Sequence, residues 1–356
     1  MTRFRRSALA LFAAGTVALA AACGSGGGTT TVTKNSPSGQ NTDSKVLTGA
    51  GSTLVYPLIS QWEPDYATKA GVTITYGAIG SGGGIGAITA RSVDFGASDA
   101  PLTPDQATAC KDCLQIPWAL AATVVTYNVK GVEDKLKLDG PTVADIFLGN
   151  ITQWDDPAIK ALNPGVSLPA TKITPVYRSD GSGDSYVFTS YLSAVSPDWK
   201  SKVGASTQPA FPTGVGSEKN SGVAASIQST DGSIGYVAVA YIAADSLNMA
   251  LLKNAAGNFP EPTLDGITAA ADAVTTINDD GSVPLVNPPA SAADAYPMST
   301  YSYAIVPKTS DVSKTMADFL TYAITKGQSF GADLGFPPLP DAIVQHDKEV
   351  ISQITS

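Results

Sequence analysis

Short strand patterns alternate with helix patterns along this chain, and this alternation restricts the possible fold more than any other feature. Residues 72–79, VTITYGAI, alternate as a strand does and lead into GSGGGIGAITA, a glycine-rich loop that opens a short helix. A second short strand at 93–102, VDFGASDAPL, follows and ends in a turn that contains Asp99 and Pro101. Strands that alternate with helices predict an α/β fold with mixed sheets.

The remainder of the chain continues the alternation. Strand patterns near 123–129 and 300–306 are separated by a long stretch of sequence. Two helical patterns fall within 142–165, a helix, an Asp-Gly turn and a buried strand within 221–242, and a helix with a glycine stop within 312–327. The chain is long enough for two domains with cores of their own.

The first 45 residues have the composition of an export signal and a tether. In residues 1–22, three arginines precede an uncharged run rich in Ala and Leu, which is shorter than the roughly 20 residues that cross a bilayer. Residues 24–45 are rich in Gly, Ser, Thr and Asn without hydrophobic periodicity, which predicts a flexible tether. We therefore expect a folded part that begins near Val46 and lies outside the cytoplasm.

Cys23 lies between these two segments. The surrounding sequence, AAAC followed by GSGGG, resembles the cleavage and acylation site of a bacterial lipoprotein, except that Leu19 is one place further from the cysteine than usual. Lipidation of Cys23 would anchor the protein to the cell membrane. A secreted protein with a free Cys23 is the alternative.

The chain is acidic, which restricts its partners. Its formal net charge of −9 becomes about −12 when the three arginines of the signal peptide are removed. Such a protein does not recognise nucleic acid through its charge, and it does not attract anions over long distances. An anion site in this chain must therefore use local donors.

Cys110 and Cys113 form a C-x-x-C pair, and His346 is the single histidine. This spacing occurs in thioredoxin-type redox sites and in half of a zinc site, but the chain has no second cysteine pair. In an oxidising compartment we expect a structural disulfide that closes a short loop. With one histidine we expect neither a metal site nor metal-based catalysis.

The stretch YRSDGSGDSYVF combines an arginine with a flexible loop at a predicted helix start. Gly181 and Gly183 allow the backbone to approach a ligand closely, and Ser182 adds a hydroxyl beside backbone N–H groups. Together with the planar donors of Arg178, this pattern favours an oxyanion. Asp184 disagrees with it, because a carboxylate repels an anion. A surface turn with an N-capped helix is the alternative interpretation.

Two motifs of enzyme families fit their surroundings poorly. GGGIGA follows a strand as a dinucleotide-binding loop would, but the next strand begins at Val93 and leaves the unit too short for a dinucleotide. GQSFG, residues 327–331, fits a nucleophile elbow, and Asp333 or Asp341 with His346 would complete the order of a serine hydrolase. Because a helical pattern precedes GQSFG and ADLGFPPLP follows it, we predict a helix end and a loop.

Three further Gly/Ser/Thr loops lie at predicted strand-to-helix junctions. GAGSTLVYPLISQW places Thr53 and Leu54 at a helix start, IGSGGG does the same for Ser81, and FGASDAP puts Asp99 at a strand end. With RSDGSGDSYVFTSYL, LGNITQWDDPAIKALNPG, GSIGYV and LPDAIV, these stretches resemble the substrate-binding protein of the bacterial ABC phosphate importer over nearly the whole mature chain. VDFGASDAPL together with R-x-D-G-S-G is the most specific part of the likeness.

The resemblance implies a type II periplasmic-binding-protein-like fold, in which crossing strands form a hinge between two α/β domains and phosphate lies in the cleft. The breaks would fall at the two separated strands, which gives 46–127 plus 297–356 as one domain and 128–296 as the other. The implied function is high-affinity binding of inorganic phosphate and its delivery to the subunits of an ABC phosphate permease. The resemblance implies a monomer, without cofactor or catalytic residue.

The resemblance also assigns residues to the phosphate site. Thr53, Leu54 and Ser81 would supply hydroxyl or backbone donors from the first domain, and Leu54, where the family more often has Phe, would act only through its N–H. Arg178 would supply the positive charge, and Asp180 would hold Arg178 by pairing with it. The remaining donors of the second domain would be Ser182 and Gly183.

Asp99 is the residue that would select the ligand. A carboxylate only accepts hydrogen bonds, so the ligand must bring a proton to it. Monohydrogen phosphate has such a proton at neutral pH, and sulfate has none. A sulfate oxygen against Asp99 would place two buried acceptors in contact, at a cost of several kcal/mol.

Asp184 departs from the family, which often has Thr, a donor, at this position. The acidic variant is similar to the phosphate-binding lipoproteins of some high-GC Gram-positive bacteria. If Asp184 faces the ligand, the site has two acceptors, and we hypothesise that it favours dihydrogen phosphate or keeps one aspartate protonated or turned away. The alternative is a solvent-facing residue in the first turn of a helix, where acidic residues are common.

Two other functions share parts of this pattern. An extracytoplasmic phosphohydrolase could use the same pocket, but it needs a nucleophile with an adjacent base, and His346 is far in sequence from every glycine loop. A periplasmic adhesin or signalling receptor would keep the fold without the pair of Asp99 and Arg178.

Overall fold

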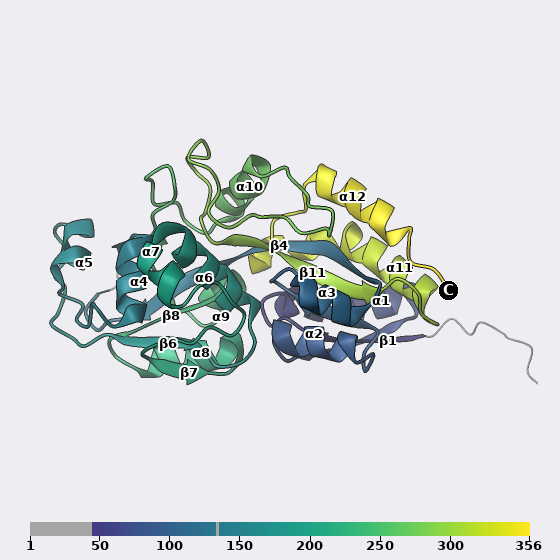
Figure 1. The fold of residues 1–356 in the computed structure, drawn as a ribbon, viewed down its shortest axis with the longest axis horizontal. Helices are drawn as coiled ribbons and strands as arrows, with labels where there is room; N and C mark the ends of the chain where they lie inside the picture. Colours follow the sequence, from purple (N-terminus) through teal and green to yellow (C-terminus); the bar gives the residue numbers. More distant parts are fainter. Residues whose placement is uncertain (1–44, 133–134) are drawn as a thin grey trace, which may run out of the picture. The chain divides into compact units, whose positions relative to one another are not determined.

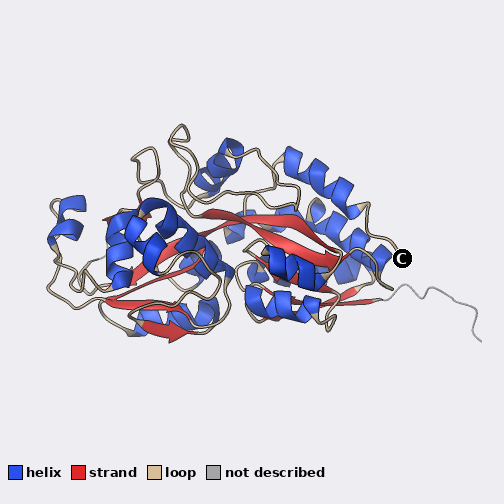
Figure 2. Ribbon diagram, in the orientation of Figure 1, coloured by secondary structure: helices blue, strands red, loops and turns tan. Residues whose placement is uncertain are grey.

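Two long antiparallel strands, β4 (Cys113–Asn128) and β11 (Ser299–Pro307), form the centre of the fold (Figures 1 and 2). The computed structural model describes residues 45–132 and 135–356. β4 contains no charged side chain, and both strands are buried along nearly their whole length. Strands of this composition are typical of a sheet that is covered on both faces.

The elements before β4 and after β11 in the sequence, which we call the first half, extend the sheet on one side. The strand order is β2-β1-β3-β11-β4, with β1 parallel to both β2 and β3, and β3 antiparallel to β11. This half consists of β1 (Val46–Gly51), α1 (Tyr56–Ala70), β2 (Thr73–Ala78), α2 (Ser81–Thr89), β3 (Phe95–Ser98), α3 (Pro104–Cys110), α11 (Ser313–Ala323), the 3₁₀ helices η1 (Lys326–Phe330) and η2 (Ala332–Leu334), and α12 (Asp341–Ile351).

The elements between β4 and β11, which we call the second half, extend the same sheet on its other side. The order continues β4-β8-β6-β7, with β8 antiparallel to β4 and with β6 parallel to both β8 and β7. This half consists of β5 (Lys137–Leu138), α4 (Gly140–Leu148), α5 (Pro157–Leu162), β6 (Thr174–Arg178), α6 (Gly183–Val195), α7 (Pro197–Lys202), β7 (Val215–Ser217), α8 (Lys219–Ser229), β8 (Ser233–Ala238), α9 (Val239–Ala244), β9 (Asn248–Met249), β10 (Leu251–Leu252) and α10 (Leu264–Ala273).

β4 is shared by the two halves, because its residues 113–122 pair with β11 and its residues 123–128 pair with β8. The sequence indicates this strand only near 123–129, since Pro117 and several alanines obscure the pattern before it. Pro117 lies at a bulge in which Trp118 is the extra residue, and a bulge tolerates the missing N–H of proline. The division into 46–127 plus 297–356 and 128–296 stays a prediction.

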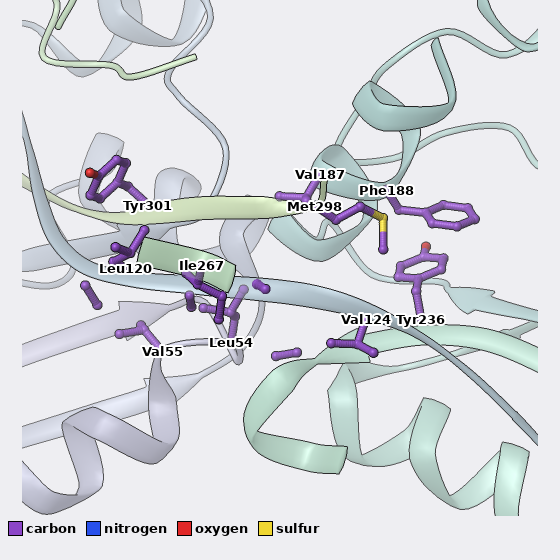
Figure 3. Close-up of a cluster of buried hydrophobic side chains, with 14 of the residues drawn as sticks. Leu54, Val55, Leu120, Val124, Val187, Phe188, Tyr236, Ile267, Met298 and Tyr301 are labelled. Carbon is purple, nitrogen blue, oxygen red and sulfur yellow. The ribbon is translucent and has the colours of Figure 1, made fainter. Parts of the chain in front are cut away.

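A continuous hydrophobic core surrounds the crossing strands (Figure 3). In the second half the rings of Phe188 and Tyr236 stack with their centroids 4.3 Å apart, and Trp62 of α1 and Trp118 of β4 meet edge to face at 5.3 Å. Such aromatic pairs contribute about 1 kcal/mol each beyond the area that they bury. All four tryptophans of the chain are fully buried, as expected for packing residues.

The helix α2 packs closely against the sheet, and this contact positions the first predicted loops. A Cβ atom on Gly84 would lie 2.5 Å from the Cα atom of Gly51 and 2.8 Å from the carbonyl oxygen of Ala97. Any side chain at Gly84 would therefore push the helix away from β1 and β3. The close contact brings Ser81, the first residue of α2, next to Asp99 at the end of β3.

The predicted local elements are present where the structure describes them. The patterns within 142–165 form α4 and α5, those within 221–242 form α8 and β8, and GQSFG forms the 3₁₀ helix η1, so no strand-to-helix elbow exists there. Cys110 and Cys113 form a disulfide with an S–S distance of 2.01 Å. The predicted signal peptide, Cys23 and the tether lie outside the described residues. Within the described part, no helix has the length and apolar character needed to span a membrane.

Candidate functional site

The candidate site lies where the two halves meet. The first half contributes the β1–α1 loop, the N-terminus of α2 and the end of β3, and the second contributes the end of β6 and the N-terminus of α6. The N–H of Gly183 donates to Oγ of Ser81 at 3.0 Å, and the N–H of Gly82 donates to the carbonyl of Gly181 at 2.9 Å, so the halves are in direct contact. Apart from Asp180 and the glycines, the members are at most 3% exposed: Thr53, Leu54, Ser81, Asp99, Arg178, Ser182 and Asp184.

Asp99 is a buried carboxyl group that is held by two serines. Oγ of Ser52 donates to it, at 2.7 Å from Oδ1 and 2.6 Å from Oδ2, and Oγ of Ser81 lies 3.3 Å from Oδ2. Burial, together with the nearby charge of Asp184, raises the pKa of Asp99 to about 7, although the hydrogen bonds from the serines oppose this rise. Asp99 is therefore a proton-sensitive acceptor in a site from which water is largely excluded.

Arg178 and Asp180 form a bidentate ion pair. Nε of Arg178 donates to Oδ1 of Asp180 at 2.7 Å, and Nη2 donates to Oδ2 at 2.5 Å. Burial opposes ionisation of Asp180, but the hydrogen bonds and the charge of Arg178 outweigh it, so the pKa of Asp180 lies below its ordinary value. This pair fixes the plane of the guanidinium, as the resemblance implies.

Asp184 faces inward, and the interpretation as a solvent-facing residue is wrong, because the residue is 1% exposed. Its Oδ2 accepts from Nη1 of Arg178 at 3.1 Å and from Nδ2 of Asn220 at 2.8 Å, while its Oδ1 accepts from Oγ1 of Thr123 at 2.8 Å. Burial raises its pKa, and the charge of Arg178 with the bonds from Thr123 and Asn220 opposes that rise. Three of the five guanidinium N–H groups thus point at carboxylates, and two remain for another acceptor.

The N-terminus of α6 supplies part of the predicted donor set. Oγ of Ser182 accepts from the N–H of Ser185 at 3.2 Å and so caps the helix. The N–H of Ser182 donates to the carbonyl of Thr207 at 2.9 Å, so this residue can serve a ligand through its hydroxyl rather than its backbone. A Cβ atom on Gly183 would lie 2.4 Å from Oδ2 of Asp99, which explains the need for glycine at this point of contact.

Three residues of the cluster were not among the predicted ones: Ser52, Thr123 and Asn220. Ser52 belongs to the same GAGST loop as Thr53, so the loop pattern could have identified it. Asn220 is the second residue of α8, just after the strand-to-helix junction that follows β7. Thr123 lies in a strand that reads as buried and apolar, and no local signal marks its role.

Thr53 and Leu54 lie in the cluster, although their polar groups contact protein partners. Oγ1 of Thr53 accepts from Nδ2 of Asn220 at 2.9 Å, and the N–H of Leu54 donates to Oγ of Ser52 at 3.0 Å. Since Asn220 also bonds Asp184, one amide connects the first half to the second.

The residues of the serine-hydrolase motif lie elsewhere. His346 is on α12, its Nδ1 lies 3.2 Å from Oδ1 of Asp347, and it lines a small cavity with Gln115 and Gly281. In the part of the chain that the structure describes, no group of three or more His, Cys, Asp and Glu residues could hold a metal ion.

Comparison with known proteins identifies relatives of this chain. A family model described as a PBP superfamily domain matches residues 31–326. The phosphate-binding protein PstS of Xylella fastidiosa is 42% identical over 314 residues, which cover 87% of this chain and 85% of that protein. The phosphate-binding protein PstS2 of Mycobacterium bovis is 36% identical over 369 residues, which cover 95% of this chain and 96% of that protein.

Solved structures resemble the fold. A phosphate-binding protein from Stenotrophomonas maltophilia matches with a TM-score of 0.67 at 19% identity, covering 85% of this chain and 93% of that chain. A high affinity periplasmic phosphate-binding protein (PfluDING) bound with phosphate matches with a TM-score of 0.67 at 20% identity. The match covers 87% of this chain and 99% of that chain. The predicted α/β fold of the two-domain periplasmic-binding-protein type, with its mixed sheet, is confirmed.

Proposed function

The chain belongs to the PstS family of phosphate-binding proteins within the PBP superfamily, and on that premise we propose that it binds inorganic phosphate outside the cytoplasm and delivers it to an ABC-type phosphate permease. The phosphate site comprises Thr53, Leu54, Ser81, Asp99, Arg178, Ser182, Gly183 and Asp184, with Asp180 in support.

The observation that carries this proposal is the burial of Asp99 and Arg178 in one cluster between two helix N-termini. An oxyanion is attracted by local donors, namely Arg178, the serine hydroxyls and the N-terminus of α6. Local donors are needed because the acidic chain does not attract anions over long distances. Asp99 accepts only, so the oxyanion must carry a proton. Phosphate satisfies both demands, and sulfate meets only the first.

Asp184 adds a second demand for protons. With Asp99 and Asp184 in one buried cluster, the site favours dihydrogen phosphate, or it holds monohydrogen phosphate with one of the two aspartates protonated. Phosphate affinity then falls as pH rises through the second pKa of phosphate.

The protein acts on phosphate by binding and release, without changing it. Strands β4 and β11 link residues 46–127 plus 297–356 to residues 128–296, and a hinge there closes the domains on the ligand. A phosphohydrolase in the same pocket would need a base beside a nucleophile, and His346 makes its hydrogen bond to Asp347 instead.

The location follows from the N-terminal sequence. Residues 1–22 direct export, a lipid on Cys23 anchors the monomer to the outer face of the cell membrane, and residues 24–45 let it reach the permease. Mass spectrometry of the mature N-terminus tests this, because a diacylated Cys23 is expected and an unmodified Cys23 would support the secreted form.

Calorimetric titration tests the function. Phosphate and then sulfate are added to the 46–356 fragment, freed of bound ligand, at pH 6 and pH 8. We expect one-site phosphate binding, weaker at pH 8, and no heat from sulfate at pH 8, where Asp99 is ionised. Failure to bind phosphate would refute the proposed function. Affinity that is flat or rising between the two pH values would refute the role of Asp184 alone.

A further inference from the structure

A cavity of about 450 Å³ lies beside the phosphate site, between the two halves. Thr53 belongs to both the cavity and the site. Its Oγ1 accepts from Asn220 at 2.9 Å, its carbonyl accepts from the hydroxyl of Tyr241 at 3.2 Å, and Asn220 in turn bonds Asp184. A short chain of contacts therefore connects the cavity to the buried charges. The lining residues are Thr53, Tyr56, Tyr76, Ala78, Lys219, Ser221 and Tyr241.

Lys219 is the one charged residue in this lining. It is exposed and forms no ion pair with any residue in the described ranges. The neighbouring carboxylate of Glu218 is not part of the cavity lining. Its backbone has a left-handed φ of +63°, and its N–H donates to Oδ1 of Asp180 at 2.9 Å. Strain of this kind persists where surrounding contacts hold the residue. The backbone of Lys219 is thus hydrogen-bonded to the same carboxylate that pairs with Arg178.

The overall charge of the chain gives a cation at this position a specific use. At a net charge of −9, or about −12 after export, the protein repels phosphate at long range. A local cation can attract phosphate only within about 10 Å, which is the screening length at about 0.1 M salt. An ammonium group on a flexible stem, strongly hydrated, holds an anion weakly and lets it move on, whereas the fixed fork of Arg178 retains it.

We propose that Lys219 captures phosphate in this cavity before the anion enters the buried site. Lys219 then sets the rate of phosphate association, while Arg178 and the helix N-termini set the rate of dissociation. Entry requires the contacts of Thr53 with Asn220 and Tyr241 to open. This inference rests on the proposed function and adds to it the route and the residue that governs capture.

The test measures association and dissociation rates by stopped-flow intrinsic fluorescence on the full-length chain, kept in detergent and freed of phosphate. At low ionic strength we expect Lys219→Gln to lower the association rate about five- to tenfold, which is the Coulomb effect of one charge on a divalent anion about 7 Å away. The dissociation rate should stay within about twofold, and the difference should vanish near 1 M salt, where the screening length is about 3 Å.

Matched variants separate capture from general charge and from folding. Lys200→Gln removes the same charge from the exposed face of α7 and should leave the phosphate association rate unchanged. Lys219→Arg keeps the positive charge at position 219 and should keep the original association rate. An equal association rate in Lys219→Gln and Lys200→Gln, or a loss located in dissociation, would overturn the inference alone. If the unaltered chain binds no phosphate, the proposed function fails and the inference fails with it.

Discussion

Oδ2 of Asp184 lies 3.1 Å from Nη1 of Arg178, while Asp180 occupies Nε and Nη2 of the same guanidinium. With Asp99 the cluster holds three carboxyl groups, of which those of Asp99 and Asp184 are buried, and one permanent positive charge. An anion that joins this cluster adds negative charge to it, so binding is favoured when the anion or one of the carboxyl groups carries a proton. Ligand binding and proton binding are therefore expected to be linked.

Replacing Asp184 tests this linkage. In Asp184→Thr a hydroxyl replaces the second acceptor, so the affinity for phosphate should depend much less on pH. The original chain should lose up to about tenfold in affinity per pH unit between pH 6 and pH 8. Calorimetry in buffers of different ionisation enthalpy measures both the affinity and the protons taken up.

Asp105 provides the matched control for Asp184. It is also an acidic residue in the first turn of a helix, but it is exposed. Asp105→Thr should leave both the affinity and its pH dependence unchanged. Equal pH dependence in Asp184→Thr and the original chain would contradict the role assigned to Asp184.

Asp99→Asn should admit sulfate. The amide can donate a hydrogen bond, which removes a contact between two acceptors that costs several kcal/mol. Because burial raises the pKa of Asp99 to about 7, this carboxyl group is mostly protonated at pH 6 and can donate a hydrogen bond. The original chain should therefore discriminate against sulfate less strongly at pH 6 than at pH 8. Competition between sulfate and phosphate at both pH values measures this. Continued exclusion of sulfate by Asp99→Asn would show that another group selects the ligand.

Gly183→Ala should weaken phosphate binding without unfolding the protein. The new methyl group would lie 2.4 Å from Oδ2 of Asp99 and 2.7 Å from Oγ of Ser81, both in the other half, so the halves must separate. We expect the affinity to fall at least about tenfold while the free energy of unfolding changes by about 1 kcal/mol or less. Calorimetry and urea unfolding measure the two quantities.

Gly86→Ala is the control for a methyl group added near the same loops. Gly86 is an exposed residue of α2, and an added Cβ atom meets nothing within 4 Å. This variant should bind phosphate normally and gain about 0.5–1 kcal/mol of stability, because alanine favours the helix. Similar affinity losses in both variants would rule out the contact with Asp99 as the cause.

Asp347 should make stability fall as pH rises. It is completely buried, and burial raises its pKa to about 7, whereas an unfolded chain titrates it near the ordinary value of 3.8. Between about pH 4 and pH 7 the folded state holds a proton that the unfolded state releases, so stability is lost across this window. The hydrogen bond to Asp347 raises the pKa of His346, whose contribution is also lost as pH rises.

Asp347→Asn should remove most of this pH dependence. Urea unfolding at pH 5 and pH 8 should show a loss of up to about 3 kcal/mol in the original chain and a much smaller loss in the variant. His346→Gln, measured in the same way, separates the histidine from the carboxyl group. A loss that is equal in Asp347→Asn and the original chain would exclude Asp347 as its source.

Much of this protein was predictable from short stretches of its sequence. The alternation of strands and helices, the turns at Gly149 and the Gly/Ser/Thr loops around Thr53, Ser81 and Ser182 depend on neighbouring residues, and each carries its own pattern. The likeness to phosphate-binding proteins rests on the same loops, which is why the family could be recognised before the structure.

The tertiary structure decided what distant residues do to one another. Asn220 forms hydrogen bonds with Thr53, which lies 167 positions away in the sequence, and with Asp184, which lies 36 positions away. No local sequence pattern predicts either contact. The inward direction of Asp184 and the raised pKa of Asp99 were likewise invisible in the sequence, because burial and neighbouring charge arise only when separated segments pack together. Sequence determines the local conformation of each loop, whereas the electrostatics of the site depend on the packing of all of them.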